Sequence, residues 1–177
     1  VANLPLYQLI GGAHRQHIPV YGYGMMLRPE PLEDLTVRFQ EEARAIKDMG
    51  FVATKMKVGL GPRADIKLAE AVRRGIGDDF RFMVDANHCY TTSDAFEVGR
   101  ALEDLDAYWF EEPIAPEDLQ GYRELRAGLN VNISGGEAEF NRWGWRSLLE
   151  SRGLDIAQPE VCALGGISEY LRVLALC

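Results

Sequence analysis

Three carboxylates at equal spacing are the clearest chemical feature of this 177-residue sequence. Asp85, Glu111 and Glu137 lie 26 positions apart and then 26 again, and each follows a short run of residues typical of a strand. Three carboxylates that converge repel one another unless a cation lies among them. Ligation by Asp and Glu oxygens, with room for water and substrate, suits Mg²⁺, although ligand type leaves Ca²⁺ and Mn²⁺ open. Solvated charges or helix-cap partners are the alternative, which equal spacing on successive strands disfavours.

The middle carboxylate belongs to an aromatic segment, Tyr108–Pro113 (YWFEEP). Tyr108 to Phe110 predicts a short buried strand, because aromatic residues favour packed strands, and Pro113 cannot continue a strand ladder. Side chains alternate along a strand, so Glu111 and its neighbour Glu112 must point to opposite sides. An inward carboxylate is costly unless a cation or hydrogen bonds meet it. We expect Glu111 to bind a metal, and Glu112 to pair with a lysine or arginine of the wall.

Two lysines form a second candidate group. Lys55 and Lys57 are two positions apart in FVATKMKVG, so they face the same way along a strand. Their side chains start about 6.7 Å apart, and at an effective dielectric near 20 their charges repel by about 2.5 kcal/mol. This repulsion would lower the pKa of one lysine toward the range of a general base. Solvated lysines on an exposed strand are the alternative, and the apolar neighbours Phe51, Val52 and Met56 disfavour it.

Strand-like and helix-like segments alternate along the chain. The strand-like runs are HIPVYGYGM, FVATKMKVG, RFMVDAN, YWFEEP, VNISGGEAE and LDIAQPE. The helical patterns cover 32–49, 64–76, a segment opened by Thr92-Ser93-Asp94 as cap candidates, 117–129, 143–151 and 167–177. Strict alternation predicts parallel strands joined by right-handed helical crossovers.

Two α/β architectures fit this alternation, an open doubly wound sheet and a closed barrel. No GxGxxG joins the first strand to its helix, which disfavours a dinucleotide-binding sheet. Polar residues end several strands, as a barrel requires at its active end: Lys57, Asp85, Glu111, Glu137 and Glu160. We therefore predict a (β/α) barrel of the TIM type. A complete barrel needs about 250 residues, so the chain holds about six of eight units.

Composition limits the partners. The formal net charge of −8 disfavours nucleic acid and anionic membranes as partners, and no apolar run approaches the roughly 18 residues that span a bilayer. The 3 cysteines are odd in number and form no CxxC, which favours a reducing, cytoplasmic compartment. The chain begins with Val1 and shows no signal peptide, so we expect a mature or partial segment.

Five short motifs stand in order along the chain, and together they carry a family resemblance. They are TKMKVG (54–59), VDAN (84–87), FEEP (110–113), GGE (135–137) and QPE (158–160). The sequence from about residue 4 resembles the enolase superfamily, in its mandelate racemase and muconate lactonizing enzyme group. The resemblance implies a modified barrel with a separate α+β capping domain. Residues 1–16 would be a connector from that missing domain, and 17–177 part of the barrel.

The resemblance also implies roles for individual residues and a reaction. Asp85, Glu111 and Glu137 would be the Mg²⁺ ligands, with Asn87 beside the metal and the substrate. Lys57 would be the acid/base, and Lys55 would lower its pKa and contact the substrate carboxylate. The implied chemistry is abstraction of the proton α to a carboxylate, giving an enediolate intermediate.

Two further positions carry expectations. Racemase-like members of the group end the sixth strand in an Asp that orients a catalytic His. This sequence has Glu160 there, whose longer side chain can still hydrogen-bond an imidazole. Lactonizing members have a Lys on the sixth strand, and residues 155–160 contain none. His88 follows Asn87 at the mouth of the predicted barrel, where it contacts substrate or belongs to a surface loop.

The segments LPLYQLIGG (4–12) and GGEAEFNRWG (135–144) resemble acid-sugar dehydratases of this group. We therefore expect a Mg²⁺-dependent lyase that dehydrates a sugar acid, and a homo-oligomer. Racemisation or epimerisation of a 2-hydroxy or related carboxylic acid is the second candidate. A non-catalytic metal-binding barrel is a third, from another class, which the presence of both Lys55 and Lys57 argues against.

Overall fold

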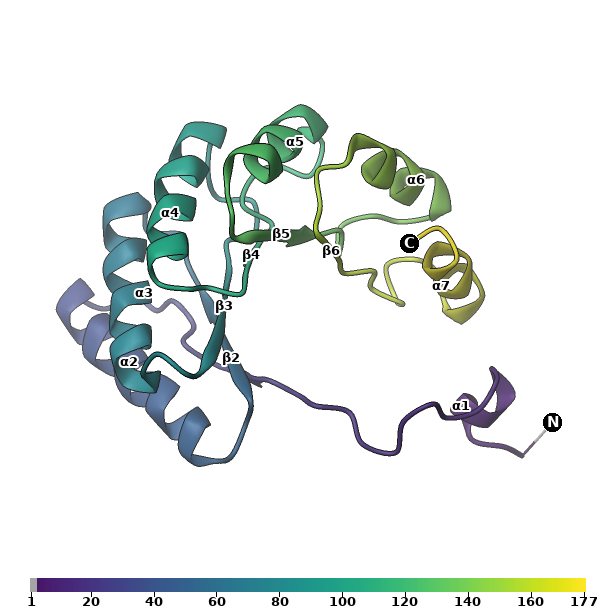
Figure 1. Cartoon of the computed structure of the whole chain (residues 1–177), viewed down its shortest axis with the longest axis horizontal. Helices are drawn as coiled ribbons and strands as arrows, with labels where there is room; N and C mark the ends of the chain where they lie inside the picture. The colour runs from purple at the N-terminus through teal and green to yellow at the C-terminus, as the bar shows by residue number, and fades with distance from the viewer. Residues whose placement is uncertain (1–2) are drawn as a thin grey trace.

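The computed structural model describes residues 3–177 and contains one sheet of six parallel strands. The strands lie side by side in chain order: β1 (Gly22–Tyr23), β2 (Ala53–Lys57), β3 (Arg81–Asp85), β4 (Trp109–Glu111), β5 (Asn132–Gly135) and β6 (Ile156–Ala157). The sheet curls, so that its inner side faces an open space (Figure 1). Sequential parallel order with strong curvature is the arrangement of a partial (β/α) barrel, as predicted.

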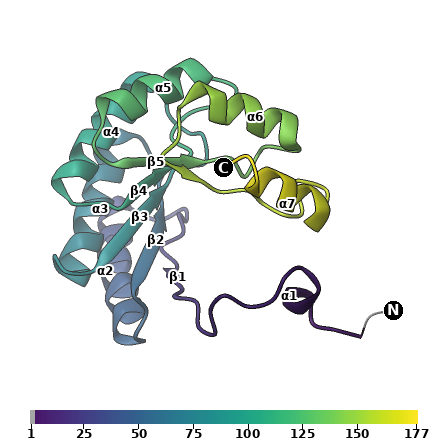
Figure 2. The same ribbon diagram turned by 45° about the vertical axis from the view of Figure 1, so that its right-hand side comes forward.

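The helices that connect successive strands cover the outer side of the sheet, and two further helices lie before β1 and after β6 in the described chain. In chain order, the helices are α1 (Leu6–Leu9), α2 (Leu32–Asp48), α3 (Pro62–Ile76), α4 (Thr92–Asp104), α5 (Leu119–Gly128), α6 (Arg142–Ser151) and α7 (Ile167–Leu174). Helix α1 stands apart from the others, on the open side of the sheet and facing α7 (Figures 1 and 2). Within the described part of the chain, no helix combines the length and the apolar character needed to cross a membrane.

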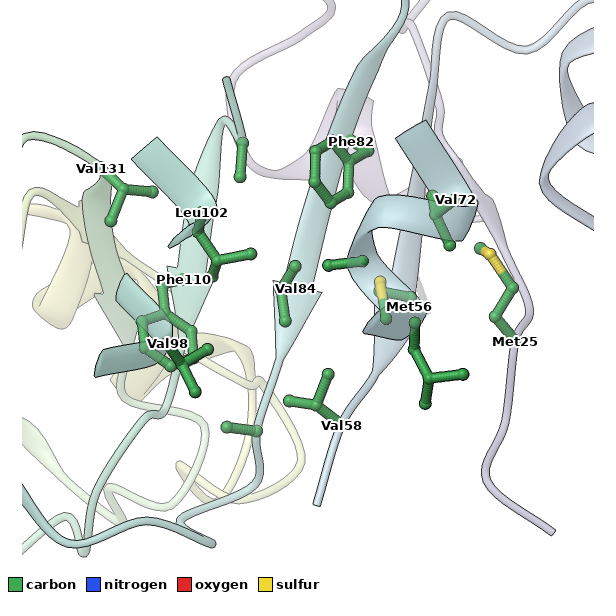
Figure 3. Packing of buried hydrophobic residues seen from close by; sticks show 14 of the residues in the cluster. Met25, Met56, Val58, Val72, Phe82, Val84, Val98, Leu102, Phe110 and Val131 are labelled. Atoms are coloured by element: carbon green, nitrogen blue, oxygen red, sulfur yellow. The ribbon is translucent and has the colours of Figure 1, made fainter. Parts of the chain in front are cut away.

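The hydrophobic core fills the layer between sheet and helices. Met56, Val84 and Phe110 point outward from three neighbouring strands and are fully buried against Val72, Val98 and Leu102 of the helices (Figure 3). Because strand side chains alternate, the residues between these positions face the inner side. The outward apolar residues therefore turn Lys55, Lys57, Asp85 and Glu111 inward.

The helix predictions agree closely with the structure. In α2 the buried residues are Leu35, Phe39, Ala43 and Ile46, whose helical spacing places them on one face. The N-cap of α4 is Thr91, one residue before the predicted cap candidates, and its side chain accepts the N–H of Asp94.

The first and last strands are shorter than predicted. Of HIPVYGYGM only Gly22–Tyr23 pairs with β2, and Ile18 and Val20 are 75% and 60% exposed. Of LDIAQPE only Ile156–Ala157 is strand. In the sheet formed by residues 3–177, each of these strands has a neighbour on one side alone, so fewer ladder hydrogen bonds extend it. Tyr108, predicted to lie in a buried strand, precedes β4 and is 37% exposed, with the Arg81 guanidinium 4.1 Å from its ring centroid.

The amino ends of β3 and β4 are held by one buried guanidinium. Arg73 of α3 is 8% exposed and donates hydrogen bonds to the carbonyls of Gly77 (2.7 Å), Phe80 (2.8 Å), Leu105 (2.9 Å) and Asp106 (3.0 Å). Burial lowers the pKa of Arg73, and the nearby aspartates only partly offset this. The planar fork of arginine serves several acceptors at once, which lysine cannot do.

We predict that Arg73→Met lowers the free energy of unfolding by about 3 kcal/mol, because several buried carbonyls lose their donor. Urea denaturation of the intact protein measures this. The matched control is Arg74→Met on the same helix, where an exposed guanidinium lies 3.8 Å from Glu70. The control should change stability by less than about 0.5 kcal/mol. Equal losses in the two variants would contradict the role given to Arg73.

Candidate metal and acid–base site

The predicted site residues lie at the carboxyl ends of four neighbouring strands. Lys57 ends β2, Asp85 ends β3 and Glu111 ends β4. In the strand register, Lys57 lies opposite Asp85, and Asp85 lies opposite Glu111. Neighbouring strands are about 4.8 Å apart, so these side chains begin side by side. Asp85 and Glu111 are 1% and 3% exposed, whereas Glu137, just past β5, is exposed.

Both lysines neutralise the buried carboxylates. Lys55 Nζ lies 2.7 Å from Glu111 Oε1 and 3.0 Å from Asp85 Oδ2, and Lys57 Nζ lies 2.5 Å from the same Asp85 oxygen. The Lys55 ammonium therefore stands between the two carboxylates. Among the described residues, no three acidic, histidine or cysteine side chains are gathered closely enough to hold a metal ion. The convergence of Asp85, Glu111 and Glu137 on one cation stays a prediction.

The pKa of Lys57 moves in the opposite direction to the one predicted. Burial lowers the pKa of each lysine, but the hydrogen bonds and charges of the carboxylates outweigh it, so the pKa values of Lys55 and Lys57 are raised. The charge of Lys55 does lower the pKa of Lys57, as expected, but its effect is smaller than those of burial and of Asp85. The nearer Asp85 carboxylate decides the outcome.

The two carboxylates also differ from each other. Burial alone would raise the pKa of Asp85. The hydrogen bonds and charges of Lys57 and Lys55 together outweigh burial, so the pKa of Asp85 is lowered. The pKa of Glu111 is raised, because burial and the neighbouring Asp85 charge outweigh its contact with Lys55. The repulsion between Asp85 and Glu111 marks the place where an additional cation would be favourable.

Asn87 connects the rim residues. Its side-chain oxygen accepts a hydrogen bond from Lys57 Nζ, and its amide Nδ2 lies 3.5 Å from Glu137 Oε1. Its backbone N–H donates to Asp85 Oδ1 at 3.2 Å. Asn87 thus joins residues at the carboxyl ends of β2, β3 and β5. Its place beside the metal and the substrate stays a prediction.

Glu112 points away from Glu111, as alternation requires, and is 1% exposed. Its partner is a histidine, not the predicted lysine or arginine: His88 Nε2 lies 2.7 Å from Glu112 Oε2. Burial raises the pKa of Glu112, while His88 opposes the rise. The His88 side chain is 30% exposed, and its predicted contact with substrate stays a prediction.

Glu160 lies past β6 and is exposed. Its Oε2 accepts the N–H of Ala163 at 2.6 Å. It lines a cavity of about 640 Å³ together with Lys55, Glu111 and Glu137. The structure thus brings Glu160 to the same opening as the lysine and the carboxylates, and its catalytic role stays a prediction.

Sequence reasoning missed the aromatic residues around the lysines. The Tyr23 ring centroid lies 5.4 Å from Lys55 Nζ and 5.9 Å from Lys57 Nζ, within the range of cation–π attraction. Tyr21 lies 5.9 Å from Lys55 Nζ, and Trp109 Nε1 donates to Glu111 Oε2 at 2.9 Å. The i, i+2 spacing of Trp109 and Glu111 was a usable signal, since it places both on one face.

Comparison with known proteins identifies a family and its relatives. Residues 38–177 match the family model described as enolase C-terminal domain-like. Over 173 residues the chain is 37% identical to arabinonate dehydratase of Saccharolobus solfataricus, covering 97% of this chain and 45% of that protein. The chain thus spans about half the length of this curated relative.

Solved structures agree in fold. The 3,6-anhydro-D-galactonate cycloisomerase of Zobellia galactanivorans is 42% identical with a TM-score of 0.87, covering 96% of this chain and 46% of that one. A racemase of Streptomyces coelicolor A3(2) with bound magnesium is 33% identical with a TM-score of 0.84, covering 97% and 50%. The family match, the sequence identity and the shared barrel fold agree, and the chain belongs to the enolase C-terminal domain-like family of the enolase superfamily.

Proposed function

We propose that this chain provides the barrel part of a Mg²⁺-dependent enzyme that removes the proton α to a carboxylate, and that its reaction is the dehydration of a sugar acid. The observation that carries the proposal is the buried network at the carboxyl ends of β2, β3 and β4, where two lysines meet two carboxylates. A group of four charges, three of them buried and one partly buried, is costly to maintain. Such cost at the active end of a barrel is typical of a catalytic site.

The donor set fits a hard divalent cation. Asp85, Glu111 and Glu137 offer only oxygen atoms, and the first two are adjacent, buried and mutually repulsive. The Lys55 ammonium now serves as their counter-ion. We propose that the three carboxylates hold Mg²⁺, as suggested also by the magnesium in the related racemase structure. When bound, Mg²⁺ would act as a Lewis acid and stabilise negative charge developing on the substrate carboxylate.

Lys57 is the proposed base, with Nζ as the atom that accepts the α-proton. A base must be neutral, and the contact with Asp85 holds Lys57 in its charged form. Neutralising Asp85 by another cation would remove that contribution. Burial, the largest contribution, and the Lys55 charge would then lower the pKa of Lys57, opposed by the smaller effect of Tyr23. A cation bound by Asp85 and Glu111 would likewise release Lys55 from these carboxylates, and Lys55 would then contact the substrate carboxylate. Glu160 is proposed to support a second acid/base group.

Loss of a β-hydroxyl after proton removal gives dehydration, whereas return of the proton to the opposite face gives racemisation. We favour dehydration because of the segments 4–12 and 135–144 and the similarity to arabinonate dehydratase. Because a related structure is a racemase, racemisation is the second candidate reaction, and the experiment must distinguish it from dehydration.

We predict that the intact protein with Mg²⁺ converts a sugar acid into a 2-keto-3-deoxy acid. A panel of aldonic and aldaric acids, assayed by a colorimetric test for 2-keto-3-deoxy acids, measures this. The same panel in D₂O, followed by NMR, reports exchange of the α-proton. Exchange without keto acid would contradict dehydration and support racemisation.

We predict that Lys57→Ala lowers kcat at least 100-fold, since proton transfer by a positioned base contributes this much or more. Mg²⁺ affinity, measured by calorimetry, should remain within tenfold of the unchanged protein. Lys67→Ala is the control, because Lys67 is exposed on α3. Unchanged turnover in the Lys57 variant would remove the base assignment and favour a metal-binding barrel without catalysis.

We predict that Glu111→Gln weakens Mg²⁺ binding at least tenfold, because a charged oxygen ligand becomes a neutral one. Isothermal titration calorimetry measures the dissociation constant. Glu97→Gln on the exposed face of α4 serves as the control and should bind Mg²⁺ as the unchanged protein does. Equal affinity in both variants would place the metal elsewhere.

A further inference from the structure

Three residues at the rim hold a backbone conformation that side chains other than glycine rarely adopt. Asn87, His88 and Glu112 have φ of 42°, 67° and 42°, in the left-handed region. Asn and His are among the residues that tolerate this region best, but each instance still costs about 1 kcal/mol or more. Such strain persists only where surrounding contacts impose it. The three residues lie in the neighbouring loops after β3 and β4, so one set of contacts can hold all of them.

Those contacts run between His88 and Glu112. The His88 N–H donates to the Glu112 carbonyl at 2.7 Å, and the Glu112 N–H donates to the Ser134 carbonyl of β5 at 2.9 Å. The imidazole adds the 2.7 Å contact with the Glu112 carboxylate. These bonds tie the loop after β3 to the end of β4, and the end of β4 to β5.

The burial of the Glu112 carboxylate favours its contact with His88. It is 1% exposed, and within residues 3–177 the imidazole of His88 is the one basic side chain in close contact with it. His88 Nε2 lies within hydrogen-bond distance of Glu112 Oε2, although neither carboxylate oxygen has a well-aligned hydrogen bond in the described part of the chain. A buried carboxylate without a partner is costly, and this cost favours the conformation that keeps His88 in place.

Asn87 precedes His88 directly, so the conformation of His88 sets where Asn87 lies. Asn87 is the residue that contacts both Lys57 and Glu137. We propose that His88 is a positioning residue: anchored on Glu112, it holds Asn87 between the base and the third carboxylate. This inference rests on the proposed function, and it assigns to His88 an indirect role distinct from contact with substrate.

Magnesium affinity tests the inference without substrate. His88→Asn keeps a residue that tolerates the left-handed region but is too short to reach Glu112, and His88→Gln keeps a donor of sufficient length. Loss of a residue that orients metal ligands commonly weakens metal binding 10- to 100-fold. In calorimetric titration of the intact protein with Mg²⁺, we expect about tenfold weaker binding for His88→Asn and recovery to within threefold for His88→Gln.

Combination with Asn87→Gly shows whether His88 acts through Asn87. Glycine keeps the left-handed backbone and removes the side chain. If the inference holds, His88→Asn causes no further loss of Mg²⁺ affinity in the Asn87→Gly background. His17→Gln, at an exposed position before β1, is the control and should bind Mg²⁺ as the unchanged protein does. Glu112→Gln provides a second, independent way to break the contact and should weaken binding in the same direction.

Turnover separates positioning from substrate contact. Positioning predicts that His88→Asn lowers kcat at least tenfold with KM within threefold. A raised KM with unchanged kcat and unchanged Mg²⁺ affinity would overturn the inference and identify His88 as a substrate contact. Equal losses with and without the Asn87 side chain would also overturn it. If the unchanged protein binds Mg²⁺ and no variant differs, only this inference falls; if it binds no Mg²⁺, the proposed function falls with it.

Discussion

The mutual neutralisation of Lys55 and Lys57 with Asp85 and Glu111 is the interaction on which the rest of the structure depends. Charged groups lose several kcal/mol of hydration when buried, and only close, opposite partners recover it. These partners come from three different strands, so they meet only if β2, β3 and β4 run parallel in one register. The apolar residues that alternate with them supply the driving force, since Met56, Val84 and Phe110 bury the other side of the same strands.

The two ends of the sheet are stabilised in different ways. At the amino ends, Arg73 donates to several backbone carbonyls and holds the connections into β3 and β4. At the carboxyl ends, strained backbone and a buried carboxylate hold the loops that carry Asn87 and His88. The contacts at the amino ends stabilise the fold. The strained backbone at the carboxyl ends lowers stability but sets the position of polar side chains. This division is common in barrels, whose active sites lie at the carboxyl ends of their strands.

The errors of sequence-based prediction share one cause. Periodicity correctly placed Lys55 and Lys57 on one face, and their mutual repulsion predicted a lowered pKa. It did not include the carboxylate of Asp85 on the neighbouring strand, which raises the pKa of Lys57 instead. It placed Glu112 opposite Glu111 but predicted a lysine or arginine as partner, where the structure has His88. It extended the first and last strands too far, because apolar alternation does not report whether a neighbouring strand is present. Each error concerns a partner that is distant in sequence.

The sequence by itself determined the alternation of strands and helices, the face of each strand and the family motifs around Lys57, Asp85, Glu111 and Glu137. These follow from local chemistry, because side-chain period, caps and strand-ending residues act over a few positions. Only the tertiary structure decided that Lys55 lies between Asp85 and Glu111, that Tyr23 flanks both lysines and that His88 anchors on Glu112. These contacts join residues on different strands and loops, and their distances are set by strand register and by loop backbone conformation, which the packing of the whole sheet imposes.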